Sequence, residues 1–413
     1  MIALKCRACG TILKDPFLSL GSQPLSNAYL TKEQLTVMEP HYPLDLYVCA
    51  KCRLVQLPEC EKAENIFNEN YAYFSSFSES WLAHCREYTE KVVKRFEINK
   101  KSFVIEVASN DGYLLQYFKA KGIPVLGVEP AAAAAKIAKK KGIPTDVTFF
   151  NTEYANRLKK NGKQADLIAG NNVLAHNPNL VDFVKGLKVA LKPDGVITLE
   201  FPHLLRFMES NQFDTVYHEH YSYISLYAAE KVFAKYGLKV FDVDELKTHG
   251  GSLRIYCRHT SDKSKAVTAS VKRVLSDEKK AGLLGEAAYA GFRKRVEKVK
   301  FDLLKFLLKA KADGKTVAGY GAAAKGNTLL NYCGVRTDFI EYTVDRNPAK
   351  QNRYLPGTHI PIYTPEKIMK TKPDYVLILP WNIKDEVMQQ MNGIKKWGGK
   401  FVVAIPELQI MEK

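Results

Sequence analysis

The sequence predicts an α/β protein of three parts: a small cysteine-rich N-terminal module, a central Rossmann-like domain and a second Rossmann-like domain at the C-terminus. Two pairs of cysteines at C-x-x-C spacing lie within the first 52 residues. Short apolar runs alternate with helix-like stretches from residue 103, and the alternation restarts at residue 316. Because alternating strands and helices build a parallel sheet covered on both faces, we expect two doubly wound domains after the module.

The length and composition of the chain are those of a multidomain globular protein. Its 413 residues exceed the roughly 250–300 at which one core stops growing. We place the cysteine-rich module at 1–75, the central domain at 76–260, and the C-terminal domain with its leading helices at 261–413. The sequence has no apolar leader and no apolar run of 18 residues, so we expect a cytoplasmic protein without a membrane partner.

The four N-terminal cysteines form two knuckle motifs, Cys6-Arg-Ala-Cys9 and Cys49-Ala-Lys-Cys52. Each pair can aim two thiolates at one ion, and two pairs complete a tetrahedron around Zn²⁺. Four protein ligands leave no open coordination position, so we expect structural zinc. Redox cysteines and unligated buried thiols are the alternatives. Among the other four cysteines no C-x-x-C pair recurs, and we read them as small apolar residues.

The formal net charge of +17 raises the question of a polyanionic partner. The excess is spread over short lysine groups at 139–141, 159–160 and 279–280, without an arginine-rich tail or a basic stripe interleaved with aromatic residues. We therefore expect a basic solvated surface and no nucleic-acid partner. The alternative is a zinc-bearing protein that uses its positive charge to bind RNA.

The remaining elements follow from apolar periodicity and turn residues. The first 60 residues are rich in turn formers, and 63–97 has a helical pattern. In the central domain we expect strands at 103–107, 125–128, 167–169 and 196–199, with helices at 113–121 and 181–191. A proline-free stretch at 264–313 predicts a continuous helical link. Strands of the last domain are expected at 316–321, 339–344, 375–379 and 401–405.

A tight turn after the first central strand, Glu106-Val-Ala-Ser-Asn-Asp-Gly112, predicts a cofactor site at the carboxyl edge of the sheet. Glu129, after the next strand, suits a ribose diol. The G-x-G-x-x-G motif of NAD sites is missing, and Glu106 and Asp111 would repel a pyrophosphate. These acids suit the sulfonium and ammonium groups of S-adenosylmethionine (SAM). The predicted SAM-binding residues are Glu106, Ala108, Ser109, Asn110, Asp111, Gly112, Glu129 and Asn171.

Two other interpretations of this turn stay open: a solvated strand-to-helix connection, and a nicotinamide site in an NAD(P)-dependent oxidoreductase that acts on nucleotide sugars.

A second polar cluster lies in residues 214–223, which hold two histidines, two acids and three tyrosines. His218 and His220 alternate, so in an extended segment they would share a face, with Tyr217 and Glu219 on the other. Imidazoles that titrate near neutral pH suggest a general base oriented by a carboxylate. A second metal site and a structural polar cluster are the alternatives.

Seven blocks in order carry a family resemblance. They are the four cysteines, Tyr71-Ala-Tyr-Phe-Ser-Ser-Phe-Ser78, Glu106-Val-Ala-Ser-Asn-Asp-Gly112, Asn171-Asn-Val-Leu-Ala-His176, Tyr217-His-Glu-His220, Thr248-His-Gly-Gly-Ser-Leu-Arg254 and Tyr320-Gly-Ala-Ala-Ala-Lys-Gly-Asn327. Together they resemble the sugar C-methyltransferases that act at C-3′ of nucleotide-linked 4-keto-6-deoxyhexoses. The resemblance spans essentially the whole chain.

This resemblance implies a zinc module, a SAM domain and a Rossmann-like domain that helps to hold the nucleotide sugar. It also implies that a base removes the C-3′ proton, which the 4-keto group makes acidic, before the carbon accepts the methyl group. By position, His220 is the base, Glu219 orients it, and Tyr217 is a neighbouring acid or oxyanion donor. His176 and Tyr71 match further active-site positions.

The substrate contacts that we expect come from both Rossmann-like domains: Asn172, His249, Tyr320, Lys325 and Asn327. His249 with Gly250-Gly251 is read equally well as a tight turn. The turn that contains Gly319 and Gly321 resembles a phosphate cradle in which Lys325 meets a diphosphate, and a vestigial dinucleotide site is its alternative. The sequence does not separate dTDP from GDP as the nucleotide. It does not determine the oligomeric state either, and we expect a monomer.

Overall fold

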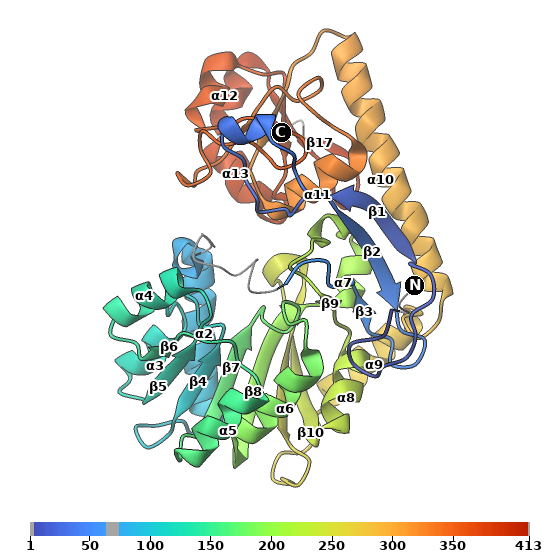
Figure 1. Cartoon of the computed structure of the whole chain (residues 1–413). Helices are drawn as coiled ribbons and strands as arrows, with labels where there is room; N and C mark the ends of the chain where they lie inside the picture. The colour runs from blue at the N-terminus through green and yellow to red at the C-terminus, as the bar shows by residue number, and fades with distance from the viewer. Residues whose placement is uncertain (1–3, 63–73, 412–413) are drawn as a thin grey trace. The chain divides into compact units, whose positions relative to one another are not determined.

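The computed structural model describes residues 4–62 and 74–411, which fold into two compact units of three segments each (Figure 1). The first unit comprises the described residues of Met1–Lys14 with Val48–Leu204 and Glu219–Leu284. The second comprises Asp15–Tyr47, Leu205–His218 and the described residues of Gly285–Lys413. Within the described ranges, no helix is long and apolar enough to cross a bilayer.

A seven-stranded sheet forms the centre of the first unit, in the spatial order β10-β11-β8-β7-β4-β5-β6. Its strands are β4 (Val104–Val107), β5 (Val125–Val128), β6 (Thr145–Asp146), β7 (Ala165–Asn171), β8 (Leu191–Pro202), β10 (Leu238–Leu246) and β11 (Ser252–His259). Six strands run in the same direction, and β11 is antiparallel to both of its neighbours, β8 and β10. The sequence predicts β5 with the observed bounds and β4 to within one residue, because both are short, fully buried runs between turns.

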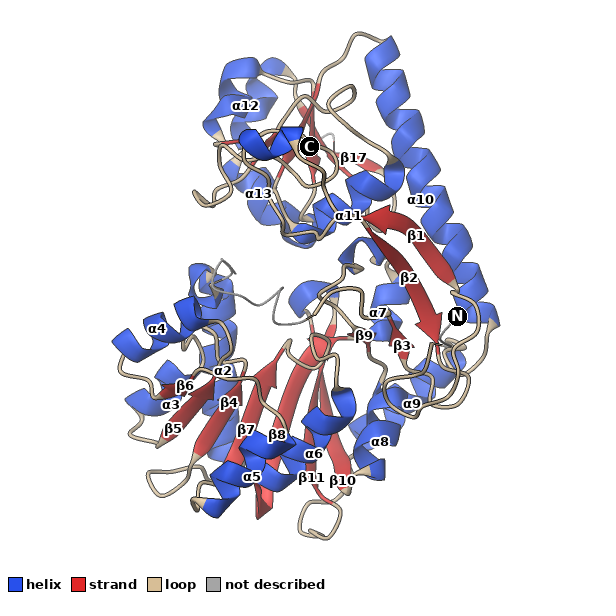
Figure 2. Ribbon diagram, viewed as in Figure 1, coloured by secondary structure: helices blue, strands red, loops and turns tan. Residues whose placement is uncertain are grey.

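Helices cover both faces of this sheet (Figure 2). They are α2 (Glu79–Arg95), α3 (Leu115–Ala120), α4 (Ala132–Lys140), α5 (Thr152–Lys160), α6 (Leu180–Ala190), α8 (Leu226–Lys235) and α9 (Ala269–Lys280), with short 3₁₀ turns η2 (Ser75–Phe77) and η4 (Thr248–Gly250). Side-chain caps fix the N-termini of several helices. Ser78 accepts a hydrogen bond from the Trp81 N–H at the start of α2, and Asn151 accepts one from the Tyr154 N–H at the start of α5. Near the N-terminal cysteines, β3 (Val55–Gln56) pairs with β9 (Ser222–Tyr223).

The second unit contains a six-stranded sheet in the order β14-β13-β12-β15-β16-β17. Its strands are β12 (Val317–Tyr320), β13 (Thr343–Val344), β14 (Ile362–Tyr363), β15 (Tyr375–Ile378), β16 (Lys400–Val403) and β17 (Gln409–Met411), of which only β17 is antiparallel to its neighbour. If these six strands are numbered 1 to 6 in chain order, their spatial order is 3-2-1-4-5-6, which is the order found in dinucleotide-binding sheets.

Helices and a hairpin complete the second unit. They are α7 (Leu204–Glu209), α10 (Ala287–Ala312), α11 (Ala324–Cys333), α12 (Glu366–Thr371) and α13 (Lys384–Gln390), the 3₁₀ turns η1 (Glu33–Thr36), η3 (Phe213–Thr215), η5 (Trp381–Ile383) and η6 (Asn392–Trp397), and the antiparallel pair β1 (Leu18–Gln23) and β2 (Tyr42–Val48). Only the first residue of α7 and the last of β2 fall in the first unit.

Two predicted elements are wrong. The helical stretch at 264–313 is not continuous, because α9 ends where Gly282 adopts φ +79° and the Leu283 N–H donates to Glu278 O at 3.1 Å, a helix-terminating turn. The strand at 339–344 shortens to β13, because the N–H groups of Phe339 and Ile340 both donate to Arg336 O in a turn.

Candidate functional site

The predicted cofactor turn lies at the carboxyl end of β4, beside the ends of β5 and β7. Three of its residues have left-handed backbone: Ala108 (φ +57°), Asn110 (φ +48°) and Gly112 (φ +78°). The N–H groups of Ala108 and Ser109 donate to Val128 O, which ties the turn to β5. A left-handed alanine is strained, and such strain persists where the surrounding structure holds the backbone for a ligand.

Buried carboxylate and hydroxyl groups gather around this turn. The Glu106 carboxylate has a hydrogen bond to the Tyr113 side chain, whereas among the described residues Ser109 Oγ and Asp111 Oδ1 have no hydrogen-bond partner. Burial raises the pKa of Glu106 well above its usual range, and the negative charges of Glu129 and Asp111 raise it further. A cation would relieve both effects. These residues therefore fit the ammonium and sulfonium groups of SAM.

Glu129, predicted to bind a ribose, also makes two hydrogen bonds within the protein. Its Oε2 accepts from the Asn110 N–H at 2.9 Å, and its Oε1 accepts from the Ala131 N–H at 2.8 Å. The carboxylate thus holds the cofactor turn in place. Each oxygen keeps a second lone pair, which a ribose diol can use.

A pair of histidines lies beyond the carboxyl end of β7. The rings of His176 and His220 meet edge to face with centroids 4.6 Å apart, and the Ser222 N–H donates to Ala175 O at 3.2 Å. Burial, opposed by a hydrogen bond to the Glu219 backbone and aided by the nearby charge of His249, lowers the pKa of His176 to about 4. His176 is therefore a neutral imidazole at neutral pH, next to the predicted base.

The predicted sharing of one face by His218 and His220 is wrong, because residues 218–219 form a turn and not an extended segment. His218 Nε2 instead lies 3.3 Å from Tyr42 O and 3.2 Å from Pro43 O in the second unit. Tyr217 also belongs to the second unit, and Tyr71 lies outside the described residues.

A buried ion network that the sequence reasoning missed is centred on Glu200 of β8. Its Oε2 lies 2.8 Å from His84 Nε2 and accepts from Arg254, and its Oε1 accepts from Thr248 Oγ1 at 2.8 Å. Burial raises the pKa of Glu200, but His84 and Arg254 together lower it to about 2. The position of Glu200 directly after the strand predicted at 196–199 was the available signal.

This network fixes the neighbourhood of His249. Thr248 precedes it, and His249 itself adopts φ +54°, an uncommon conformation for a residue with a side chain. Trp81 contacts the rings of His249 (5.5 Å), His84 (5.1 Å) and Tyr113 (5.9 Å), so one aromatic ring joins the cofactor turn to the His249 turn. The Asn172 N–H donates to Glu200 O at 2.7 Å, which places Asn172 beside the same strand.

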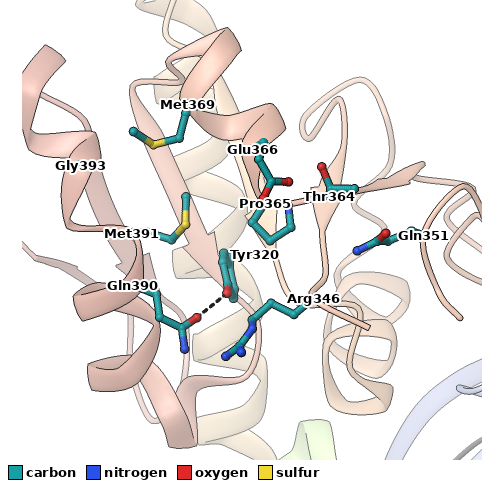
Figure 3. A pocket seen from close by; sticks show the side chains of 10 residues that line it. All are labelled: Tyr320, Arg346, Gln351, Thr364, Pro365, Glu366, Met369, Gln390, Met391 and Gly393. Atoms are coloured by element: carbon teal, nitrogen blue, oxygen red, sulfur yellow. Dashed lines mark hydrogen bonds between the residues drawn. The ribbon is translucent and has the colours of Figure 1, made fainter. Parts of the chain in front are cut away.

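The predicted substrate residues of the second unit have separate surroundings. Tyr320 Oη donates to Gln390 Oε1 at 2.9 Å (Figure 3), and Lys325 Nζ donates to Asn382 Oδ1 at 2.7 Å beneath the Trp381 ring. Asn327 is buried, and its amide donates to Ser26 O at 2.6 Å. Asp214, also buried, accepts from Trp381 Nε1 at 2.7 Å.

The four N-terminal cysteines form a closed thiol cluster in the first unit. Their sulfur atoms all lie within 4.8 Å of one another, with Cys6–Cys52 and Cys9–Cys49 each at 3.5 Å. A zinc tetrahedron with Zn–S distances of about 2.3 Å has edges of about 3.8 Å, so the cluster fits Zn²⁺. Among the described residues, it is the only group of three or more histidines, cysteines or acids placed to hold a metal.

The two knuckles have the same backbone. In each, the residue four positions after the first cysteine donates its N–H to that cysteine's carbonyl: Gly10 to Cys6 at 2.9 Å, and Arg53 to Cys49 at 3.0 Å. Both donors are left-handed, at φ +77° and +59°. Gln56 Nε2 lies 3.3 Å from Cys6 Sγ, an outer contact that orients the ligand.

Gly112→Ala is expected to weaken binding of S-adenosylhomocysteine (SAH) about tenfold and to lower stability by roughly 1–2 kcal/mol. An alanine at this position would have to adopt φ +78°, and its Cβ would lie 2.4 Å from Ile143 Cδ1. Relief of this clash would shift the cofactor turn. Calorimetric titration with SAH and a thermal melt measure the two effects. Gly122→Ala is the control, because Gly122 has φ +74° but no neighbour closer than 3.3 Å. Equal SAH affinity for both variants would contradict a cofactor role for the turn.

Comparison with known proteins covers nearly the whole chain. Family models match for a zinc binding domain at residues 6–67, a methyltransferase domain at 81–243 and a C-methyltransferase C-terminal domain at 247–406. The C-methyltransferase NovU of Streptomyces niveus is 34% identical over 407 residues, which are 98% of this chain and 96% of NovU.

Solved structures are more distant. A SAM-dependent methyltransferase from Anabaena variabilis is 16% identical, covers 43% of this chain and 86% of its own, and has a TM-score of 0.37. The magnesium protoporphyrin IX methyltransferase of Synechocystis with bound SAH is 12% identical, with shares of 43% and 82% and a TM-score of 0.34.

Proposed function

The chain belongs to the C-methyltransferase family, and we propose that this SAM-dependent enzyme methylates C-3′ of a nucleotide-linked 4-keto-6-deoxyhexose in deoxysugar biosynthesis. The observation that carries the proposal is the edge contact between His176 and His220 beyond the carboxyl end of β7, on the sheet edge that bears the cofactor turn. The seven motif blocks that resemble sugar C-methyltransferases support the choice of substrate.

In this proposal, His220 takes the C-3′ proton of the substrate. The adjacent 4-keto group makes that proton acidic, and the electron pair left at C-3′ delocalises onto the carbonyl oxygen. A hydrogen-bond donor aimed at this oxygen lowers the barrier. His176 is neutral because of its lowered pKa, and its one ring N–H already donates to the Glu219 backbone, so we assign the donor role to the Tyr217 hydroxyl. We assign Glu219 to orient His220, and the resemblance to sugar C-methyltransferases gives Tyr71 a further role in the reaction.

The turn residues from Glu106 to Gly112, with Glu129 and Asn171, would hold the cofactor. When bound there, SAM supplies a methyl group that is electrophilic toward carbon. Trp81 and the Glu200 network hold the His249 turn, and we propose that His249 and Asn172 contact the sugar. We assign residues 261–413 to the nucleotide part of the substrate, with contacts from Tyr320, Lys325 and Asn327.

Two measurements test the function. Mass spectrometry of a reaction with SAM and dTDP- or GDP-linked 4-keto-6-deoxyhexoses should show one added methyl group. In D₂O without SAM, NMR should show exchange of the C-3′ proton, because proton removal needs the base and not the methyl donor. If neither nucleotide sugar gains a methyl group or exchanges that proton, the proposal is wrong.

The pH dependence of stability tests the environment of His176. In the unfolded chain its imidazole gains a proton as the pH falls through about 6.5, whereas the folded protein resists protonation until a pKa of about 4. The unfolded state therefore binds more protons between these values, and His176 lowers stability as the pH falls through this window. His176→Gln should reduce the change in unfolding free energy with pH by up to about 1.4 kcal/mol per pH unit.

Urea unfolding at pH 7 and pH 5 measures this difference. The exposed His41→Gln variant serves as the control and should follow the wild type. Parallel pH dependence for the wild type and His176→Gln would contradict a neutral, enclosed imidazole at this position.

A further inference from the structure

Arg7 lies in the first cysteine knuckle, between Cys6 and Cys9, and its side chain is partly buried. Its guanidinium contacts two backbone carbonyls and one aromatic ring, all of them in segments far along the chain from the knuckle. A contact with a carbonyl fixes where the chain runs and not which side chain it carries there. With five N–H donors in one rigid plane, an arginine can hold several such segments in place at once.

Two of these contacts lie beside the two histidines assigned to the reaction. Arg7 Nη1 donates to Pro178 O at 2.9 Å, two residues after His176. The guanidinium carbon lies 5.3 Å from the centre of the Tyr221 ring, and Tyr221 directly follows His220. This distance is that of a cation–π contact. One side chain of the knuckle therefore contacts the chain next to each member of the histidine pair.

The third contact closes a hydrogen-bonded path around the same segments. Arg7 Nη2 donates to Leu57 O, and the Leu57 N–H donates to Tyr221 O at 3.1 Å. Leu57 directly follows β3, which pairs with β9. The first residue of β9, Ser222, donates its N–H to Ala175 O at 3.2 Å, next to His176. Arg7 is thus bonded to the same backbone network that brings the two histidine segments together.

The cysteine cluster fixes the position of Arg7 itself. Its backbone N–H donates to Gln56 Oε1 at 2.9 Å, and Gln56 Nε2 lies 3.3 Å from Cys6 Sγ. Cys6 and Cys9 bracket Arg7 in the sequence, so a metal ion held by both would fix the backbone on either side of it. The guanidinium would then extend from a rigid base, as an outer contact of a metal site does.

We propose that Arg7 is a positioning residue for proton removal: it holds the segments that carry His176 and His220, so that the two rings keep their edge contact of 4.6 Å at 78°. The inference rests on the proposed function, because that function assigns the base to His220. It gives the zinc module a role in turnover in addition to its role in stability. A shift of about 1 Å in a reacting group can lower a rate about 100-fold.

Kinetics of three full-length, zinc-loaded variants test this role. Arg7→Met keeps the length of the side chain but removes its donors, and we expect kcat and C-3′ exchange in D₂O to fall about 10–100-fold. The KM for the sugar nucleotide, the SAH affinity and the zinc content should change less than about twofold. Arg7→Lys should recover part of the rate, because an ammonium keeps the charge but not the planar fork. Lys51→Met, at an exposed position of the second knuckle, should match the wild type.

NMR gives a measurement that needs neither substrate nor SAM. Protein labelled with ¹³C at the histidine Cε1 atoms shows one resonance for each imidazole, and spectra of His176→Gln and His220→Ala assign the two that matter. Because each ring lies against the edge of the other, their chemical shifts depend on the ring geometry. Both resonances should move in Arg7→Met and stay in place in Lys51→Met.

The outcomes separate this inference from the proposed function. Unmoved resonances in Arg7→Met, with an unchanged kcat or with a lower kcat that follows zinc loss, would overturn the role of Arg7. If Arg7→Met does not fold, Arg7→Lys decides, and wild-type resonances and kcat in that variant would overturn the role. Moved resonances in a protein whose wild type methylates no 4-keto sugar would support the positioning contact and overturn the function. Methylation by the wild type, with Arg7→Met unaffected, would do the reverse.

Discussion

Replacing His220 with alanine is expected to reduce turnover by about 10²–10⁴-fold while SAH affinity and melting temperature stay near those of the wild type. His220 is the histidine in ring contact with His176, on the sheet edge that carries the cofactor turn. A general base contributes to the barrier for proton removal and not to cofactor binding. Single-turnover methyl transfer and C-3′ exchange in D₂O should therefore fall together.

His41→Ala is the matched control, because this histidine is exposed and lies in the other compact unit. If His220→Ala methylates the sugar normally but loses SAH binding, the residue belongs to the cofactor site. Near-normal exchange at C-3′ would show that another group, with Tyr217 the first candidate, removes the proton.

Cys49→Ser is expected to release zinc and to lower the melting temperature by about 10 °C, from a loss of roughly 3 kcal/mol at about 2–4 °C per kcal/mol. A serine hydroxyl is a poor zinc ligand, and Cys49 is fully buried with its sulfur 3.5 Å from that of Cys9. Metal analysis of the purified protein and a thermal melt measure the two effects.

Cys60→Ser tests whether any lost thiol would have the same effect, because Cys60 lies outside the four-sulfur cluster. That variant should keep its zinc and its melting temperature. Full zinc content in Cys49→Ser would show that three thiolates suffice, which would contradict a closed structural site.

Local signals explain why the turn after β4 was predictable. A strand end, small residues and buried acids lie within seven consecutive positions, from Glu106 to Gly112. The zinc knuckles were predictable for a similar reason, since C-x-x-C spacing fixes each half of the site.

Contacts between distant segments were not predictable. Glu200 binds His84 and Arg254, residues 116 and 54 positions away, and no periodicity relates them. The histidines at 218 and 220 were read as one extended segment, but long-range bonds decide their environments: His218 contacts carbonyls 175 and 176 positions away. The break after α9 depends on the left-handed backbone at Gly282, which composition does not reveal.

The alternation of the chain between the two compact units has a consequence for its synthesis. Six segments alternate between the units, so residues 15–47 and 205–218 leave the ribosome long before residues 285–413, with which they form the second unit. Truncation after Leu284 would therefore keep every segment of the first unit and leave two segments of the second without the rest of their unit. Nascent chains should gain protection from proteases in two steps, the first once residue 284 has emerged and the second after the C-terminal sheet has followed.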